Sequence, residues 1–361
     1  MSVDIHLKTN FHSKQNRSNC NYPSTSQEYF LRNTSSHLPS NVSGAILWSF
    51  LYAGLTNQRM RMRNGILLAA KLHRPIIISP WIHSRQTFSS NNHLPWLLIP
   101  FTKVFDVELL ISCLANYSIV ALYPCRPDNC VSGFSPPQLT QNAIEHGENI
   151  KLPFVVANFD PWFINQSSTQ DNLSSKIDNC FTWSCDVHRE GQRLLQIIKN
   201  ISKERDFSNI FGLHLRIEND FQIHIAKQRQ LNYEQDPTVL NSITNLILTN
   251  TLNCFNKVIT HTDSSQFWVY IATGETKNST KMVEIRQFFP NMITKEDLSL
   301  NDFRLGMDFM AAIDSVILEE LAFFIGFRLS TFSAQVARNR RTKGLKSALY
   351  TLDLPTRCLK L

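Results

Sequence analysis

Four ionisable side chains stand two residues apart at the end of an apolar segment: His214, Arg216, Glu218 and Asp220. In an extended chain, residues two apart point to the same face. The pattern therefore predicts that the four share one face while apolar residues fill the other. Ligands of open α/β sheets bind beyond the carboxyl ends of the strands. The run thus predicts a binding or catalytic face, and the alternative is an edge strand with a solvated face.

The chemistry available to these residues is anion binding and proton transfer. The planar guanidinium of Arg216 can bind a phosphate or carboxylate through two parallel hydrogen bonds. Glu218 and Asp220 are candidates for a general base. His214 can hydrogen-bond a ligand, or its ring can be satisfied within the core. We therefore expect the run to bind an anionic ligand and to accept a proton.

Alternating strands and helices must position this run. The apolar patterns predict strands at 44–52, 75–79, 118–123 and 153–158, and another at 267–275 that breaks at its last three residues. They predict helices from the turn at 53–56 to about residue 73, and at 190–202, 236–258 and 306–322. The polar stretch 165–189 is expected to be a surface loop. This order indicates an α/β protein that opens with a βαβ unit.

Further candidate residues lie at helix starts and within a helix. The segment Ser330, Thr331, Phe332 and Ser333 precedes a helix, whose N-terminal N–H groups and dipole favour an anion. An ordinary helix N-cap is the alternative for its hydroxyls. Asn57 stands where a strand turns into a helix, and it too can be an N-cap. Asp314 lies inside the apolar helix 306–322, where the alternative is a buried structural carboxylate paired with an arginine.

Four of these segments together resemble the protein O-fucosyltransferase-like superfamily, especially its plant and algal branch. They are the opening at 54–60 (Gly-Leu-Thr-Asn-Gln-Arg-Met), the His-Leu-Arg-Ile-Glu run at 214–218, the strand with Tyr-Ile-Ala-Thr-Gly-Glu at 270–275, and the stretch from Asp314 to Ser333. The segments match in order and spacing from about residue 44 to 341. In the opening, Ala53 and Thr56 replace residues that are commonly Gly and Asn in the family.

This resemblance implies a fold and an activity. The fold is GT-B-like, with two Rossmann-like domains facing a cleft. The activity is transfer of fucose from GDP-fucose to a hydroxyl of a protein or glycan by metal-independent inverting displacement. Relatives that use UDP-rhamnose to modify pectin, and a non-catalytic sugar- or peptide-binding protein with the same fold, are the alternatives. The expected partners are a nucleotide sugar as substrate and a protein or polysaccharide acceptor, without a separate cofactor.

The resemblance also implies roles for single residues. Arg216 and the segment Ser330–Ser333 would contact the phosphates of the donor, and Asp314 would lie near the nucleotide. Asn57 matches the asparagine of the opening motif. Glu218 and Asp220 remain the candidates for the base. Because the chain has no Asp-x-Asp pair, no metal is expected. Glu218-Asn-Asp220 is the nearest acidic pair.

Length and composition bound the domain organisation. A chain of 361 residues exceeds the size at which one core keeps growing, so two domains are expected. We predict a disordered polar segment at 1–43, an acceptor-side α/β domain at 44–205 and a nucleotide-sugar-binding α/β domain at 206–361.

Several other function classes lack support. The chain has neither a G-x-G-x-x-G nor a P-loop motif, and no H-E-x-x-H or zinc-type cysteine spacing. The net charge of +7 resides partly in two short basic runs, 59–63 and 338–343, which are interpreted as solvated helix faces. No nucleic-acid-binding motif is present, so nucleic acid is not an expected partner.

Cysteines and glycosylation sequons bear on the compartment. There are eight cysteines, whose pairing the spacing leaves open, and eight N-x-[ST] sequons. The resemblance implies the Golgi or endoplasmic reticulum lumen. A cytoplasmic enzyme is the alternative, because no signal-like segment and no run of roughly 18 to 20 apolar residues is visible. Membrane contact is expected only if an N-terminal anchor is missing from this sequence.

Overall fold

The computed structural model describes residues 45–48, 54–79, 81–84, 97–122, 154–157, 168–204, 207–234, 236, 238–258, 267–298, 306–352 and 358–361. All of them belong to one compact unit, Asn41–Leu361. The segment 1–43, which we predict to be disordered, lies outside the described residues. The division into domains 44–205 and 206–361 stays a prediction.

The first half of the chain builds a parallel sheet in the order β5-β2-β1-β6. Its strands are β1 (Ala45–Trp48), β2 (Ile76–Ile77), β5 (Ala121–Leu122) and β6 (Phe154–Ala157). Helix α2 (Leu55–Lys71) joins β1 to the parallel strand β2, which confirms the predicted βαβ opening. Between β2 and β5 lie the antiparallel pair β3 (Trp81–Ser84) and β4 (Leu97–Pro100), followed by helices α3 (Phe101–Val104) and α4 (Val107–Ala115).

The second half builds a larger sheet in the order β12-β11-β10-β7-β8-β9. Its strands are β7 (Ile210–His214), β8 (Trp268–Ala272), β9 (Met292–Thr294), β10 (Phe323–Phe327), β11 (Ser347–Tyr350) and β12 (Cys358–Lys360). All neighbours are parallel except β11 and β12. The chain adds β8 and β9 on one side of β7, and β10 and β11 on the other. The strand order therefore reverses between β7 and β10, and such a switch point is where open α/β sheets bind ligands.

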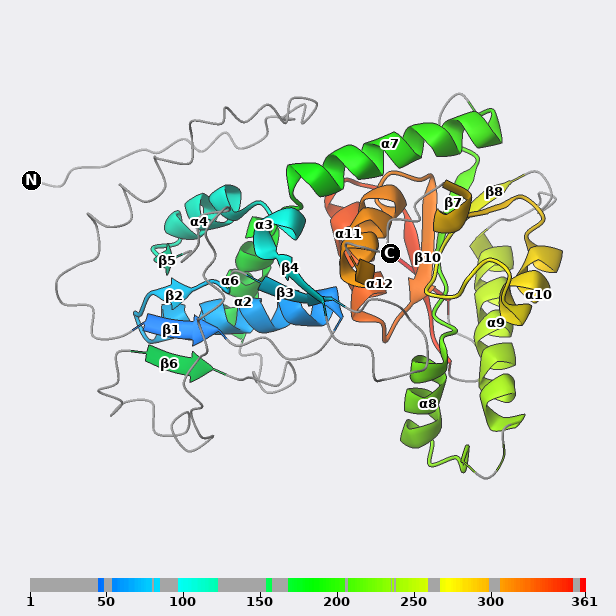
Figure 1. Cartoon of the computed structure of the whole chain (residues 1–361), viewed down its shortest axis with the longest axis horizontal. Coiled ribbons are helices and arrows are strands. Elements are labelled where there is room, and N and C mark those ends of the chain that lie inside the picture. The colour runs from blue at the N-terminus through cyan, green and yellow to red at the C-terminus, as the bar shows by residue number, and fades with distance from the viewer. Residues whose placement is uncertain are drawn as a thin grey trace, which may run out of the picture. The chain divides into compact units, whose positions relative to one another are not determined.

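Helices cover both faces of the second sheet (Figure 1). Helices α11 (Gly306–Leu318) and α12 (Thr331–Thr342) lie on one face, and α9 (Thr238–Val258) and α10 (Thr280–Phe288) on the other. Helix α8 (Asn219–Gln228) packs on α9, and α7 (Cys185–Ser202) packs along α11. None of the helices in the described ranges combines the length and the hydropathy needed to cross a bilayer.

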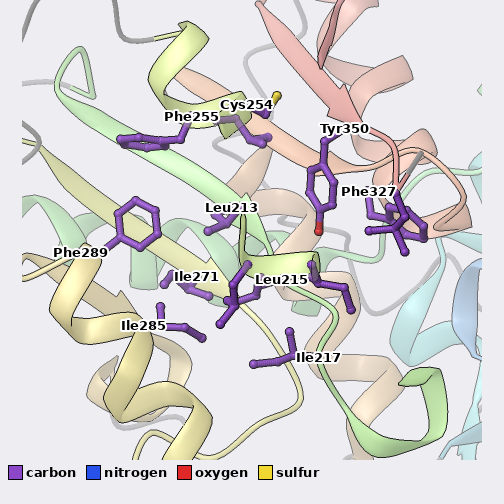
Figure 2. Packing of buried hydrophobic residues seen from close by; sticks show 14 of the residues in the cluster. Leu213, Leu215, Ile217, Cys254, Phe255, Ile271, Ile285, Phe289, Phe327 and Tyr350 are labelled. Carbon is purple, nitrogen blue, oxygen red and sulfur yellow. The ribbon is translucent and has the colours of Figure 1, made fainter. Parts of the chain in front are cut away.

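The core of this half explains the alternation seen in the sequence. Leu213, Leu215 and Ile217 are 1%, 0% and 0% exposed, and they point into an apolar cluster with side chains of α9 and α10 (Figure 2). The opposite face of β7 meets α11, because a Cβ at Gly212 would lie 2.7 Å from a methyl of Leu318. The side chains of residues 213, 215 and 217 therefore lie in the core. Those of the even-numbered residues after Gly212 point to the other side of the strand.

The predicted surface loop at 165–189 is wrong for the part that the structure describes. Residues Ser168–Cys180 form helix α6, and α7 begins at Cys185 rather than at 190. The many serines and asparagines of α6 obscure its amphipathic pattern in the sequence. Its buried side contains Ile177 and Asp178 and packs on α2. Ser184 caps α7 by accepting the N–H of Val187. Tertiary packing and this cap make helices of a stretch whose composition suggests a loop.

The interpretation of the two basic runs as solvated helix faces is also wrong for their buried members. The guanidinium of Arg59 donates to the carbonyl of Asp178 at 2.6 Å, and Arg63 pairs with the carboxylate of Asp178 at 3.1 Å. Arg338, from the second run, binds the same carboxylate. Burial lowers the pKa of Arg59 to about 10, so its guanidinium remains charged at neutral pH. Asp178 therefore joins helices α2, α6 and α12.

Arg340 is the most deeply buried of these cations, with no exposed surface. Its guanidinium donates to the carbonyl of Leu318, the last residue of α11, to the carbonyls of Leu321 and Ala322 in the turn that follows, and to the carbonyl of Lys346. The last carbonyls of a helix have no partner within the helix. A single arginine thus satisfies the end of α11 and the start of β11. Arg341 and Lys343 are exposed, as interpreted from the sequence.

Two disulfides lie within the described residues. Cys113 pairs with Cys180, and Cys254 pairs with Cys358, across 67 and 104 residues of sequence. Cys180 pairs with Cys113 rather than with Cys185, which stands close to it in the sequence. Pairing follows which helices meet in space, so sequence spacing does not reveal it.

Candidate active site

A pocket of about 300 Å³ lies at the carboxyl ends of β7, β8, β9 and β10. The start of α2, which follows β1 of the other sheet, closes its wall through Gly54, Leu55, Thr56 and Asn57. Among the lining residues are Asn57, His214, Arg216, Glu218, Asp314, Thr331 and Phe332, which the sequence singled out. The structure thus gathers seven predicted site residues in one cavity.

Two helices begin at this pocket. Leu55 is the first residue of α2, and Thr331 is the first residue of α12. The hydroxyl of Thr331 donates to the side-chain oxygen of Asn57 at 3.0 Å, which ties the two helix starts together. Because N-terminal N–H groups point outward and carry partial positive charge, this wall favours an anion. Phosphate groups are the obvious class of ligand.

Ser330 and Ser333 have structural contacts instead of a place on the pocket wall. The side chain of Ser330 caps α12 by accepting the N–H of Ser333 at 3.4 Å, as the N-cap alternative expected. The hydroxyl of Ser333 accepts the N–H of Phe327 and lies 2.7 Å from Nδ1 of His214. Gly326 permits this approach, because a Cβ there would lie 2.6 Å from the Ser333 hydroxyl.

His214 is a neutral group in the pocket wall. Burial, with help from the charges of Arg216 and Lys295, lowers its pKa to about 3. Its ring centroid lies 4.7 Å from that of Phe332. Since the Ser333 hydroxyl already accepts one N–H, donation of its own proton to Nδ1 favours the tautomer with the proton on Nε2. The imidazole can therefore donate a neutral hydrogen bond to a ligand.

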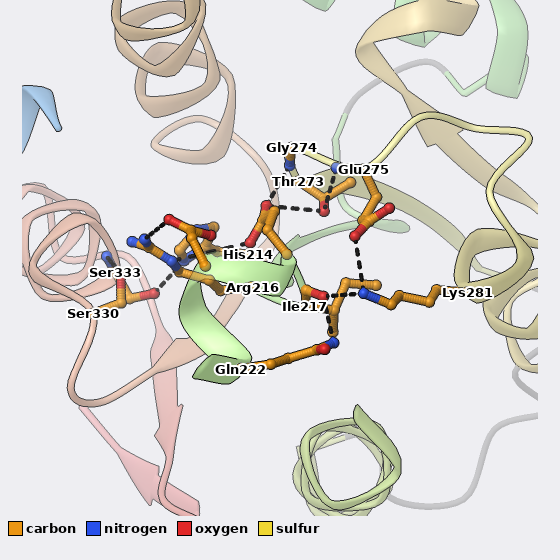
Figure 3. Close-up of polar contacts among 12 residues, drawn as sticks. His214, Arg216, Ile217, Gln222, Thr273, Gly274, Glu275, Lys281, Ser330 and Ser333 are labelled. Atoms are coloured by element: carbon orange, nitrogen blue, oxygen red, sulfur yellow. Dashed lines mark hydrogen bonds and ion pairs between the residues drawn. The ribbon is translucent and has the colours of Figure 1, made fainter. Parts of the chain in front are cut away.

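Arg216 reaches the pocket with a loosely held guanidinium (Figure 3). Its Nη2 lies 3.4 Å from Oδ2 of Asp220, and its Nε lies 4.0 Å from Oε2 of Glu218. The side chain is 35% exposed, and its guanidinium lies 5.1 Å from the ring centroid of Phe221. These contacts are long for charge-assisted hydrogen bonds, so the guanidinium is able to exchange them for a stronger anionic ligand.

Glu218 is one of three acidic residues that line the pocket, together with Asp308 and Asp314. It is 5% exposed, and its Oε1 accepts the N–H of Gly274 at 2.5 Å and lies 3.4 Å from the hydroxyl of Thr273. Its Oε2 is buried and has no hydrogen-bond partner among the described residues. Burial raises the pKa of this carboxyl, although Arg216 and the N–H of Gly274 act in the opposite direction. A carboxylate oxygen that accepts no hydrogen bond and belongs to a group with a raised pKa is suited to accept a proton from a ligand.

Asp220 does not share the face of the other three residues. Strand β7 ends at His214, and the inward alternation continues only to Glu218, the N-cap of α8. Asp220 lies in the first turn of α8, its side chain is 40% exposed, and the pocket lining does not include it. The prediction of one face for all four residues is thus wrong for Asp220. Helix geometry replaces the two-residue period after Glu218.

Lys295 and Asp308 line the pocket without having been singled out from the sequence. Lys295 follows β9 and begins the short 3₁₀ helix η3 (Lys295–Leu298). Its position at the carboxyl end of a strand was the available signal, because parallel strands end at the same edge. Asp308 lies in α11 and accepts the N–H of Leu55 at 2.5 Å, so it caps α2 from a distant part of the chain. No sequence pattern reveals that contact.

Asp314 lines the pocket, and its carboxylate has two partners. Its Oδ2 lies 2.7 Å from Nζ of Lys295, and its Oδ1 accepts the hydroxyl of Tyr270 at 2.6 Å. The expected alternative was a buried carboxylate paired with an arginine, and here the cation is a lysine. In the described part of the chain, no cluster of three His, Cys, Asp or Glu side chains is arranged to hold a metal ion.

Comparison with known proteins decides the family. The model of the GDP-fucose protein O-fucosyltransferase family matches residues 50–343. The chain belongs to this family. It is therefore a glycosyltransferase, and the predicted α/β, GT-B-like fold is confirmed. No curated protein matches the sequence.

Solved fucosyltransferase structures are similar to this chain at low sequence identity. POFUT1 in complex with GDP is 14% identical, with a TM-score of 0.48, covering 84% of this chain and 96% of that chain. NodZ alpha-1,6-fucosyltransferase co-crystallized with GDP is 12% identical, with a TM-score of 0.49, covering 88% and 98%. Fucosyltransferase NodZ from Bradyrhizobium is 11% identical, with a TM-score of 0.47 and the same coverage.

Proposed function

We propose that this glycosyltransferase moves fucose from GDP-fucose to a hydroxyl of a protein or glycan in one inverting step, without a metal. Family membership supports the donor. The observation that carries the proposal is the pocket itself, where two helix starts, two cations and the buried carboxylate of Glu218 meet. The helix starts and the cations suit a diphosphate, and the carboxylate suits the acceptor's proton.

The proposed reaction uses these groups in distinct roles. The acceptor oxygen forms a bond to the anomeric carbon as the bond from that carbon to the diphosphate oxygen breaks. The electron pair leaves with GDP, and the acceptor proton moves to Oε2 of Glu218. Arg216 and the N-termini of α2 and α12 bind the diphosphate as its negative charge grows, so they stabilise the transition state more than the bound donor. Asp220 is the weaker candidate for the base, because it lies off the pocket.

A donor screen tests the proposal. The protein is titrated with GDP, UDP, GDP-fucose and UDP-rhamnose in a thermal-shift assay, and release of GDP or UDP from each sugar is measured. A ligand at 100 times its Kd should add about 2.7 kcal/mol of stability. We expect GDP to stabilise the protein and GDP-fucose to turn over in the presence of EDTA.

Three outcomes would contradict the proposal in different ways. Preference for UDP and turnover of UDP-rhamnose would identify the rhamnosyltransferase alternative. Binding of GDP without any turnover would identify a non-catalytic binding protein. Turnover that vanishes with EDTA and returns with Mn²⁺ would replace the metal-independent mechanism and point to Glu218-Asn-Asp220 as the ligand pair.

We also propose that the enzyme works in the Golgi or endoplasmic reticulum lumen. Two disulfides support this, because such bonds persist in oxidising compartments. The sequon asparagines within the described residues are all exposed: Asn116, Asn172, Asn200 and Asn278. Full-length protein made in a eukaryotic host should gain gel mobility on endoglycosidase treatment. Unchanged mobility together with recovery in the cytosolic fraction would contradict the proposal.

A further inference from the structure

Lys295 differs from the other pocket residues in that its ammonium group is held in place by one hydrogen bond and still has N–H donors for a ligand. Its side chain is 12% exposed, and its position directly after β9 places it at the carboxyl edge of the sheet. An ammonium group has three donors. Within the described residues, its one recorded hydrogen bond goes to Asp314 at 2.7 Å. Two donors therefore remain for a ligand.

The partners of Lys295 are themselves held in place. Asp314 is 5% exposed in the middle of α11, and Tyr270 is fully buried in the middle of β8. The hydroxyl of Tyr270 donates to Oδ1 of Asp314 at 2.6 Å, which leaves Oδ2 for the ammonium. Burial and the neighbouring carboxylate raise the pKa of Tyr270 well above its usual value, so this donor keeps its proton. A flexible lysine is thereby fixed at the pocket wall.

We propose that Lys295 is a catalytic cation, whose ammonium binds an oxygen of the donor's diphosphate while Asp314 and Tyr270 position it. This inference rests on the proposed function, because it assumes a nucleotide sugar in the pocket. Arg216 and Lys295 would then supply two positive charges to the leaving group from different strand ends. The competing explanation is structural: Lys295 serves only to neutralise the buried carboxylate of Asp314.

Paired variants separate the two explanations. Lys295→Met leaves Asp314 as an uncompensated buried charge, so it loses stability under either explanation. The double variant Lys295→Met with Asp314→Asn removes both charges and keeps a side-chain oxygen for Tyr270. It should recover most of the lost stability. Lys277→Met is the matched control, because Lys277 pairs with Asp297 at 3.5 Å and lies outside the pocket lining.

The readouts are GDP release from GDP-fucose and the affinities for GDP and guanosine. For the folded double variant we expect turnover to fall by about 10² to 10³, as when one preorganised donor is removed. GDP affinity should fall at least about tenfold, and guanosine affinity should stay unchanged, because the lost contact is to the diphosphate. The control should behave like the parent.

The outcomes distinguish this inference from the proposed function. A double variant that is stable, binds GDP and turns over like the parent would overturn the role of Lys295 alone. Equal losses for GDP and guanosine would also overturn it, because they would place the ammonium at the nucleoside. A parent protein that neither binds GDP nor releases it from GDP-fucose would overturn the proposed function and this inference together.

Discussion

Replacement of Arg216 tests whether its guanidinium only forms a surface ion pair or makes a catalytic contact with the diphosphate. In the structure its guanidinium has two long contacts to carboxylates, at 3.4 and 4.0 Å, and it is 35% exposed. The pair with the exposed Asp220 contributes about 0 to 1 kcal/mol, and a cation–π contact at an exposed site adds about 0.5 to 1 kcal/mol. The 4.0 Å contact to the buried Glu218 is too long for a hydrogen bond. Arg216→Ala should therefore cost at most about 2 kcal/mol of the free energy of unfolding.

The effect on catalysis should be far larger than the effect on stability. If Arg216 binds the diphosphate as it leaves, its removal should lower kcat by about 10² to 10³ and weaken GDP binding. Arg216→Lys should fail as well, because a point charge does not reproduce two parallel hydrogen bonds. In both variants the folded protein remains available for assay, so loss of activity is not loss of fold.

The assay is urea denaturation, GDP titration and GDP release from GDP-fucose for the parent and each variant. Arg193→Ala is the control, because Arg193 makes a shorter two-point contact with Glu190, at 2.6 and 2.8 Å, on the outside of α7. It should lose a comparable amount of stability and no activity. If Arg216→Ala and Arg216→Lys both bind GDP and turn over like the parent, the proposed diphosphate site is wrong.

Three further predictions concern stability. Burial raises the pKa of Glu218, so its stabilising contribution is present below the unfolded-state pKa and is lost as pH rises through the folded-state value. Glu218→Gln should therefore gain stability relative to the parent as pH rises above the ordinary carboxyl pKa of 4.5 in urea titrations, while transfer is lost; a pH-independent difference would contradict this. Arg340→Met leaves the buried carbonyls of Leu318 and Leu321 without their arginine donor, at about 1 to 3 kcal/mol each, and should lower the denaturation midpoint strongly. Its control, the exposed Arg341→Met, should be neutral, and equal midpoints for the two would refute the role of Arg340. Asp178→Ala keeps the carbonyl that accepts from Arg59 but removes the carboxylate that pairs with Arg63 and Arg338, and it should cost about 3 to 5 kcal/mol by the same measurement; a loss under about 1 kcal/mol would show that the cluster is solvated.

Local pattern was enough to predict much of the second sheet and part of the site. The period-two alternation around His214 determines which residues enter the core, because burial of Leu213, Leu215 and Ile217 leaves the opposite face to the pocket. The resemblance implied that residues after β7 and residues at the start of α12 bind the same phosphates. They lie together because the ends of parallel strands meet at one edge of the sheet. The alternation failed at Asp220, because the chain had already turned into α8.

Other features were decided by contacts between distant segments. Lys295 gains its role from Asp314 and Tyr270 on different elements, and Asp308 caps α2 across 253 residues of sequence. Disulfide pairing and the burial of the arginines around Asp178 likewise depend on which helices meet. The sequence by itself determined the periodicity of each element and the chemistry offered at its ends. Only the tertiary structure decided which of those ends share one low-dielectric pocket, because that depends on helix packing and strand order, which no local pattern encodes.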